Sequence, residues 1–160
     1  MLLIYRIIFN LILFLSPLIV FIRLIKKKES FVRFKEKFCF NSIKKIKGKL
    51  IWFHGASVGE LQSIIPLIEK IEKNKKIKQI LVTSNTLSSS KIMEKIKSKK
   101  IIHQFFPIDT NFLSNKFLNY WKPDLAIFLE SEIWPSMFRS LKKKKYSFNF
   151  IKCKNNKKNI

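Results

Sequence analysis

The sequence predicts an α/β fold, a Rossmann-like parallel sheet with helices on both faces. Short apolar segments such as 80–83 and 124–129 alternate along the chain with helical patterns such as 90–99 and 111–120. Strands that are apolar almost throughout are typical of parallel sheets that are buried on both faces. Their alternation with helices is typical of βαβ units. A charge-free apolar run precedes this region and predicts an additional N-terminal helix.

The apolar run at 7–22 contains no charged residue, but it is shorter than the roughly 20 residues of an upright spanning helix. Arg6 and Arg23 can extend its reach by snorkelling. The basic cluster, Arg23 with 26–28, follows the run, and no small-residue cleavage site is present, so a secretory signal is disfavoured. We therefore predict an uncleaved membrane anchor at 1–25, with the following domain in the cytoplasm. A spanning and an interfacial orientation both remain open, and a buried core helix or a signal peptide is the alternative.

A basic connector at 26–48 separates the anchor from the predicted domain at 49–151. Its phenylalanines at 31, 34, 38 and 40 suit a short helix on a membrane surface, and a solvated linker is the alternative. Within the domain, strands are expected at 49–53, 80–83, 101–106, 124–129 and 148–151, and helices at 61–74, 90–99, 111–120 and 133–145. The predicted inward-facing side chains of the second and third of these helices are Ile92, Met93, Ile96, Phe112, Leu113, Phe117 and Leu118.

The chain carries 33 basic and 10 acidic residues, a formal charge of +23, which is typical of proteins that bind nucleic acid or anionic membranes. Lysine, isoleucine, asparagine and phenylalanine dominate together, and these are residues of A+T-rich codons, so codon bias explains much of the lysine. The aromatic residues fall on apolar faces instead of alternating with lysines, which argues against a nucleic-acid partner. Cys39, Cys153, His54 and His103 lack the spacing of a metal site or a disulfide framework, so no metal is predicted.

Two of the three glycines fall in one stretch, His54-Gly55-Ala56-Ser57-Val58-Gly59-Glu60, between a predicted strand and a predicted helix. Ser57 and Glu60 have the spacing of a capping box, which is a purely structural explanation. Glu60 is also a candidate general base, because the helix dipole stabilises negative charge in the first turn and a carboxylate can accept a hydroxyl proton. The stretch lacks the Gly-Lys-Ser/Thr ending of a P-loop and the three-glycine spacing of a dinucleotide-binding turn, which argues against a phosphate-binding loop.

A second acidic stretch, Glu130-Ser131-Glu132-Ile133-Trp134-Pro135, directly follows a predicted apolar strand. Ligands of open α/β sheets bind beyond the carboxyl ends of the strands, where both this stretch and Glu60 are expected. A charged helix start with proline in its first turn is the structural alternative.

Together the two stretches resemble the 3-deoxy-D-manno-octulosonic acid (Kdo) transferases, glycosyltransferases of lipid A. Phe106-Pro107-Ile108-Asp109 also resembles the family's Leu-Pro-Tyr-Asp segment, and the similarity extends from the anchor to about residue 151. Ser131 stands where the family commonly has threonine, and Cys39 stands where glycine is usual.

The resemblance implies a GT-B architecture, in which an N-terminal domain meets the lipid acceptor and a C-terminal domain holds the donor CMP-Kdo. It implies that Glu60 is the catalytic base and Glu130 a transition-state stabiliser. Ser57, Gly59 and Glu132 are implied to shape the site. The implied reaction is an inverting transfer of Kdo to a lipid A precursor, lipid IVA, in lipopolysaccharide biosynthesis, with no cofactor beyond the donor substrate.

After residue 151 the sequence Lys152-Cys153-Lys154-Asn155-Asn156-Lys157 departs from the family's Asn-Ala-Arg continuation. Deleting one base from an A-rich codon at 152 permits the family reading, so 152–160 is expected to be a frameshifted tail. The CMP-Kdo-binding domain is then expected to be absent and the chain to be a truncated, inactive fragment. The alternatives are a non-catalytic, membrane-associated lipid A-binding module and a basic nucleic-acid-binding protein.

Overall fold

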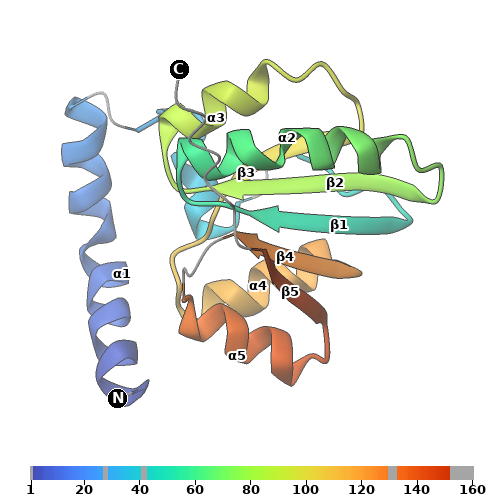
Figure 1. The fold of residues 1–160 in the computed structure, drawn as a ribbon. Coiled ribbons are helices and arrows are strands. Elements are labelled where there is room, and N and C mark those ends of the chain that lie inside the picture. Colours follow the sequence, from blue (N-terminus) through green and yellow to red (C-terminus); the bar gives the residue numbers. More distant parts are fainter. Residues whose placement is uncertain (1, 27–28, 41–42, 130–132, 152–160) are drawn as a thin grey trace, which may run out of the picture.

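The computed structural model describes residues 2–26, 29–40, 43–129 and 133–151 and shows the predicted parallel sheet (Figure 1). Its strands run in the order β3-β2-β1-β4-β5, and every pairing between neighbours is parallel. The strands are β1 (Lys49–His54), β2 (Ile77–Ser84), β3 (Ile101–Phe105), β4 (Leu125–Leu129) and β5 (Ser147–Ile151). The order reverses at β1, because the chain builds outward through β2 and β3 before it returns to the other side as β4.

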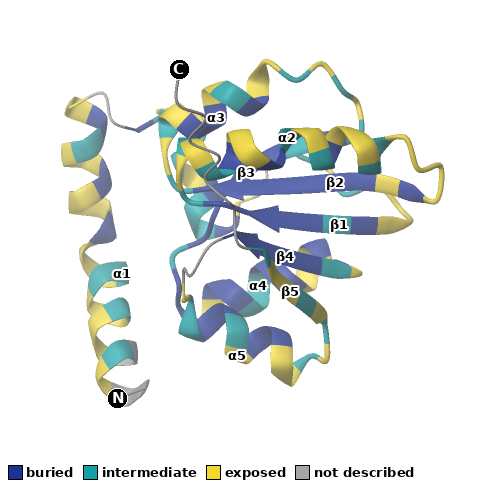
Figure 2. Cartoon of the chain, viewed as in Figure 1, coloured by how far each residue is buried: buried dark blue, intermediate teal, exposed yellow. Residues whose placement is uncertain are grey.

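Helices cover both faces of this sheet, as the sequence predicted. On one face, α2 (Val58–Glu72) and α3 (Leu87–Glu94) pack against β1 and β2 in a core that includes Phe53 and Met93. On the other face, α4 (Asn111–Trp121) and α5 (Pro135–Lys143) enclose a core built around Trp52. Figure 2 shows that burial is concentrated in the strands and on the helix faces that cover them.

Capping side chains explain where the helices begin. Ser57, Thr86 and Thr110 are extended residues whose hydroxyl oxygens accept backbone N–H groups of α2, α3 and α4. The prediction of a helix at 90–99 was therefore wrong at both ends. The cap at Thr86 starts α3 earlier, and bonds from Lys95 and Ile96 to carbonyls three residues back close its last turn.

Two further expectations for this domain were wrong in detail. Phe112, predicted to face inward from the helix at 111–120, is 70 % exposed, whereas Leu113, Phe117 and Leu118 are buried as expected. The helix predicted from residue 133 begins at Pro135, because proline at the first helical position already has the required φ and lacks the N–H that would go unpaired.

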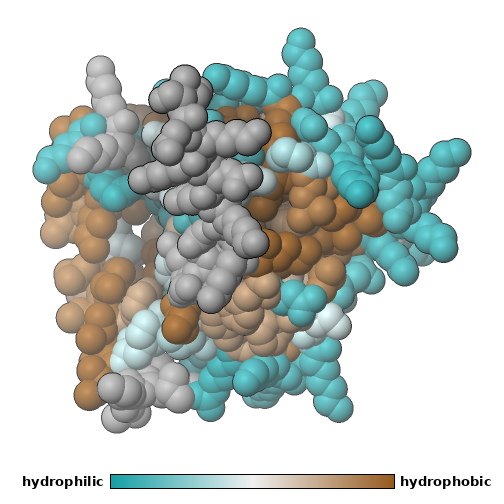
Figure 3. All heavy atoms as spheres, viewed as in Figure 1, coloured by the Kyte–Doolittle hydropathy of each residue, from teal (hydrophilic) through white to brown (hydrophobic). Residues whose placement is uncertain are grey.

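The N-terminal helix α1 (Leu2–Ile25) stands beside the domain, and the arrowheads of β1 and β2 point toward it (Figure 1). Among the described residues it contains a segment, Ile7–Ile25, that is long and apolar enough to cross a membrane by length and composition alone. Ser16, Val20 and Leu24 are buried against the domain. The opposite face exposes a stripe of large apolar side chains at alternating spacings of three and four residues: Ile4, Ile7, Leu11, Phe14, Leu18, Phe21 and Ile25. We call this set the outer stripe; Figure 3 shows apolar residues along the length of α1.

The connector is attached to the domain by a short 3₁₀-helix, η1 (Phe34–Phe38), so its described part is not a solvated linker. The Lys37 carbonyl accepts the N–H of Ile108, and the Cys39 thiol, buried in the Trp52 core, donates to the carbonyl of Leu113. Cys39 has a φ of 58°, the left-handed conformation that glycine adopts without strain. This backbone angle gives a physical reason for glycine at the position, and here cysteine adopts it.

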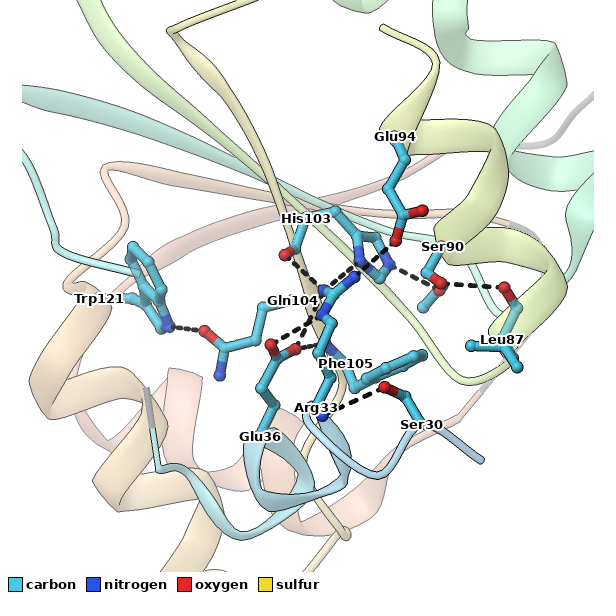
Figure 4. A network of polar contacts seen from close by, with 11 residues as sticks. Ser30, Arg33, Glu36, Leu87, Ser90, Glu94, His103, Gln104, Phe105 and Trp121 are labelled. Carbon is cyan, nitrogen blue, oxygen red and sulfur yellow. Dashed lines mark hydrogen bonds and ion pairs between the residues drawn. The ribbon is translucent and has the colours of Figure 1, made fainter. Parts of the chain in front are cut away.

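Arg33 organises a network that fixes η1 to the edge strand β3 (Figure 4). Its guanidinium donates to both carboxylate oxygens of Glu36, to the backbone carbonyl of His103 at 2.9 Å and to His103 Nδ1 at 2.8 Å. Glu36 is buried and also accepts the N–H of Phe105 at 2.9 Å. Because a guanidinium is always a donor, Nδ1 of His103 is the acceptor, and Nε2 donates to Ser84 Oγ. The neutral imidazole is therefore the form that fits this network.

This network predicts a loss of stability in acid. Burial, together with the Arg33 charge, lowers the pKa of His103 to about 3 from its ordinary 6.5. Between pH 6.5 and about 3, His103 is therefore protonated in the unfolded chain and neutral in the folded one. Its contribution to the free energy of unfolding is complete above pH 6.5 and is lost as the pH falls toward 3. We expect the free energy of unfolding to fall with a slope of up to about 1.4 kcal/mol per pH unit from this group.

The measurement is urea unfolding of the wild type and His103→Gln at several pH values between about 7 and 4.5. Because glutamine does not titrate, the variant should lose stability less steeply on acidification, whatever its stability at neutral pH. The carboxylates that face His103 through Arg33, Glu36 and Glu94, are the same in both proteins. Parallel slopes would show that His103 does not carry the acid sensitivity.

Candidate functional site

The first stretch and the described end of the second, 133–135, meet at the carboxyl end of the sheet, where the strand order reverses. His54, the last residue of β1, is in register with Phe128 of β4, so the first stretch begins beside the end of β4. A Cβ on Gly55 would lie 2.7 Å from Cδ1 of Leu129, a contact too close for any larger residue. Leu129 directly precedes Glu130, so the first stretch touches the residue from which the second begins. Such a reversal point is where open α/β sheets bind ligands.

Glu60 lies in the first turn of α2, and its carboxylate is held by the turn itself. Oε1 accepts the Ser57 hydroxyl at 2.7 Å, and Oε2 accepts the N–H of Ala56 at 3.0 Å. Ser57 Oγ in turn accepts the N–H of Glu60, the cap that the spacing predicted, but the returning bond of the carboxylate goes to the N–H of Ala56 and not to that of the N-cap residue Ser57. The side chain is partly exposed, and each carboxylate oxygen has a second lone pair that can accept another proton donor.

Gly59 leaves the surface beside Glu60 open. A Cβ at this position would meet no heavy atom within 4 Å, so packing gives no reason for glycine here. Glycine inside a helix costs about 1 kcal/mol relative to alanine. No packing contact of the described residues therefore offsets the cost of glycine at this position of α2.

An aromatic cluster connects all three family-like segments. The ring of the buried His54 lies 4.0 Å from that of Phe106 and 5.8 Å from that of Trp134, measured between centroids. Phe106 and Trp134 are themselves 4.9 Å apart. His54 Nδ1 lies 2.9 Å from Thr83 Oγ1, which fixes the plane of the ring. The cluster places Trp134, and with it the end of the second stretch, against the first.

Asp109 is a second connection, and its role was not predicted from the sequence. It is fully buried, with its Oδ2 accepting the Tyr5 hydroxyl at 2.6 Å and the N–H of Ser136 at 2.9 Å. Its Oδ1 accepts the N–H of Met137 at 2.8 Å and lies 3.4 Å from the Ser114 hydroxyl. The carboxylate thus caps the first turn of α5 from a distant segment, and it also binds the N-terminal helix. Trp134, the residue before α5, provides no side-chain cap of its own.

The remaining predicted site residues divide into two groups. Ser57 and Gly59 lie beside Glu60, as predicted. Glu130 and Glu132 lie outside the described residues, as do Cys153 and the predicted tail at 152–160. Among the described residues, no group of three or more His, Cys, Asp or Glu side chains is arranged to hold a metal ion.

A family model described as 3-deoxy-D-manno-octulosonic-acid transferase (Kdo transferase) matches residues 32–159. The chain belongs to the Kdo transferase family. This Kdo transferase chain is 45 % identical over 117 residues to the 3-deoxy-D-manno-octulosonic acid transferase of Rickettsia bellii. The aligned region covers 73 % of the chain and 28 % of the relative. It is 36 % identical over 115 residues to a probable mitochondrial 3-deoxy-D-manno-octulosonic acid transferase of Arabidopsis thaliana, covering 72 % of the chain and 26 % of that protein. The matched part thus spans about a quarter of the length of these relatives.

Asp109 gives a direct test of this site's construction. We expect Asp109→Ala to reduce the free energy of unfolding by about 2 kcal/mol, the upper range for loss of a helix cap, because several buried donors lose their acceptor. Tyr5→Phe removes one donor and leaves the carboxylate bonded to α5, so a loss of about 1 kcal/mol is expected. Chemical denaturation of the three proteins measures both values. Equal losses in the two variants would show that capping of α5 adds nothing to the Tyr5 bond.

Proposed function

We propose that this chain forms the acceptor-binding side of an enzyme that transfers Kdo from CMP-Kdo to a lipid A precursor, lipid IVA. The observation that carries the proposal is the contact between the Glu60 turn and the start of the Glu130 stretch, through Gly55 and Leu129. We assign CMP-Kdo to a facing domain of a GT-B enzyme. The chain's membership of the Kdo transferase family supports the transfer reaction, and the sheet geometry supports the place of the acceptor.

In this proposal Glu60 is the general base. It removes the proton from an acceptor hydroxyl, whose oxygen forms a bond to the anomeric carbon of Kdo as the bond to CMP breaks and CMP leaves with the electron pair. Attack opposite to the leaving group inverts the anomeric centre. The bonds from Ser57 and Ala56 orient the carboxylate, and a base positioned in this way typically contributes about 10²–10⁴-fold to the rate.

The neighbouring residues support this step in the proposal. Glu130, which directly follows Leu129, stabilises the transition state, while Glu132 shapes the second stretch. Gly59 leaves room for the acceptor ring next to the base. Ser57 holds the carboxylate in place.

Glu60→Gln separates the catalytic role from the structural one, because glutamine also completes a capping box but is not a base. The test protein joins residues 1–151 of this chain to the remaining sequence of the R. bellii relative, and transfer of Kdo from CMP-Kdo to lipid IVA is measured. We expect Glu60→Gln to lower kcat about 10²–10⁴-fold with little change in Tm. The exposed Glu69→Gln on the same helix is the matched control and should keep full activity. An active Glu60→Gln enzyme would assign Glu60 to capping alone.

We also propose that α1 lies in the membrane interface of the inner membrane's cytoplasmic face and does not span the bilayer. The first half of the helix is bonded to the domain through Tyr5 and Asp109, and the second half to the connector through Arg23 and Glu29, which Lys37 of η1 also bonds. A helix held along its length can lower only its outer stripe into the lipid, as interfacial helices do. The formal charge of +23 favours an anionic surface.

Polarised infrared spectroscopy of the chain on oriented bilayers tests this orientation. The amide dichroism of isotopically labelled 7–22 should place the helix axis close to the membrane plane. Phe14→Glu, in the middle of the outer stripe, should reduce binding to vesicles. Gln62→Glu, at an exposed position of α2, adds the same single negative charge outside that stripe and should leave binding unchanged. A helix axis along the membrane normal would contradict the proposal.

A further inference from the structure

The structure holds a groove between α1 and the domain that the catalytic proposal does not use. Its volume is about 290 Å³, and its walls come from α1 on one side and from the ends of β2, β3 and the start of α5 on the other. A second hollow of about 380 Å³ shares Phe9 and Asp109 with it, so the two are neighbours along α1. Figure 1 shows the position of α1 opposite the strand ends.

The surface of the groove is apolar on both walls. Ile12, Ile19 and Val20 line it from α1, and Phe106, Ile108 and Trp134 line it from the domain. Its acidic and hydroxyl side chains are already bonded within the protein. Glu29 accepts Arg23 at 3.1 Å and Lys37 at 2.6 Å, Ser16 donates to the Leu13 carbonyl, and Asp109 caps α5. The groove therefore presents mainly hydrocarbon to an occupant, which favours a ligand without polar groups along its length.

The groove also reaches the aromatic cluster that adjoins the Glu60 turn. Phe106 and Trp134, which line the groove, both contact His54 at the end of β1. On its other side it is bounded by a helix whose outer stripe is apolar. A lipid that leaves a bilayer beside α1 thus meets hydrocarbon surface up to the ring cluster that supports the Glu60 turn.

From this arrangement we infer that the groove binds one acyl chain of the glycolipid acceptor while the sugar lies at Glu60. The inference rests on the proposed function, because it takes the acceptor to be an acylated sugar. The groove of about 290 Å³ lies at the lower end of the roughly 300–1,000 Å³ of ligand pockets, a size that suits part of one acyl chain. Each buried methylene raises affinity about fourfold, so the chain contributes to acceptor affinity and orients the sugar.

Photo-crosslinking of the full chain in phospholipid nanodiscs tests the inference. The probe is lipid IVA with a diazirine in one acyl chain, and phosphatidylethanolamine with the same photoreactive chain is the comparison. We expect lipid IVA to label both walls, Ile12 and Ile19 on α1 and 106–108 on the domain, in a saturable manner. Phosphatidylethanolamine should label only the outer stripe.

Ile12→Trp fills the groove, and Leu11→Trp is the matched control on the exposed side of the same helix turn. We expect Ile12→Trp to weaken saturable labelling of 106–108 on the order of tenfold, the affinity that burial of about two methylene groups supplies, and Leu11→Trp to leave it unchanged. Circular dichroism checks the folding of both variants. If Ile12→Trp does not fold, the label map of the wild type decides the question.

The outcomes separate the groove from the proposed function. If lipid IVA binds the wild type in a saturable manner but labels only the outer stripe, or if Ile12→Trp binds as Leu11→Trp does, the groove inference is wrong and acceptor binding stands. Equal labelling of the groove by phosphatidylethanolamine would replace the acceptor with a bilayer lipid as occupant and overturn the inference. If no saturable binding of lipid IVA occurs at all, both the groove and the acceptor-binding proposal fail.

Discussion

The buried carboxylate of Asp109 is the interaction on which the arrangement of this site depends. A carboxylate removed from water is strongly destabilising unless donors replace the lost hydration. Here two backbone N–H groups at the start of α5, the Tyr5 hydroxyl and the Ser114 hydroxyl take that place. The partial positive charge of a helix N-terminus adds to the stabilisation. Because these donors come from α1, α4 and α5, satisfying one charge fixes three helices relative to the end of β3.

The position of α5 then fixes where Trp134 lies relative to the end of β1. Trp134 directly precedes α5, so capping by Asp109 places its ring against Phe106 and His54. On the other side of the second stretch, Leu129 is fixed against Gly55 by the strand pairing of β1 with β4. Leu129 and Trp134, which lie on either side of 130–132, are therefore both held against the first stretch, through Gly55 and His54 respectively.

Most of the fold could be predicted from the sequence because its determinants are local. Apolar runs specify the strands, and the Ser57–Glu60 spacing specifies the turn and its cap. What could not be predicted depends on contacts between distant segments. Asp109 is separated from Tyr5 by 104 positions in the sequence. The residues that surround Asp109 in the sequence do not indicate that its carboxylate oxygens bond to distant segments. A partial signal was present, because α5 begins with Pro135 after a tryptophan that cannot cap, so the cap had to come from another part of the chain. Phe112 was misassigned because the helical period alone cannot tell a packed edge position from an exposed one.

The N-terminal helix is bonded both to the connector and to the domain. Glu36 is buried against Arg33 and the N–H of Phe105, and Glu29 is buried between Arg23 of α1 and Lys37 of η1. Separating α1 from the rest of the chain would take Arg23 away from the buried Glu29, and removing one partner of a buried pair is costly. Tyr5 bonds the other half of the helix to the carboxylate that caps α5. Tyr5 of α1 and the start of α5 are therefore joined by a short path of buried polar bonds through Asp109, so the helix and the carboxyl end of the sheet are held in one fixed geometry.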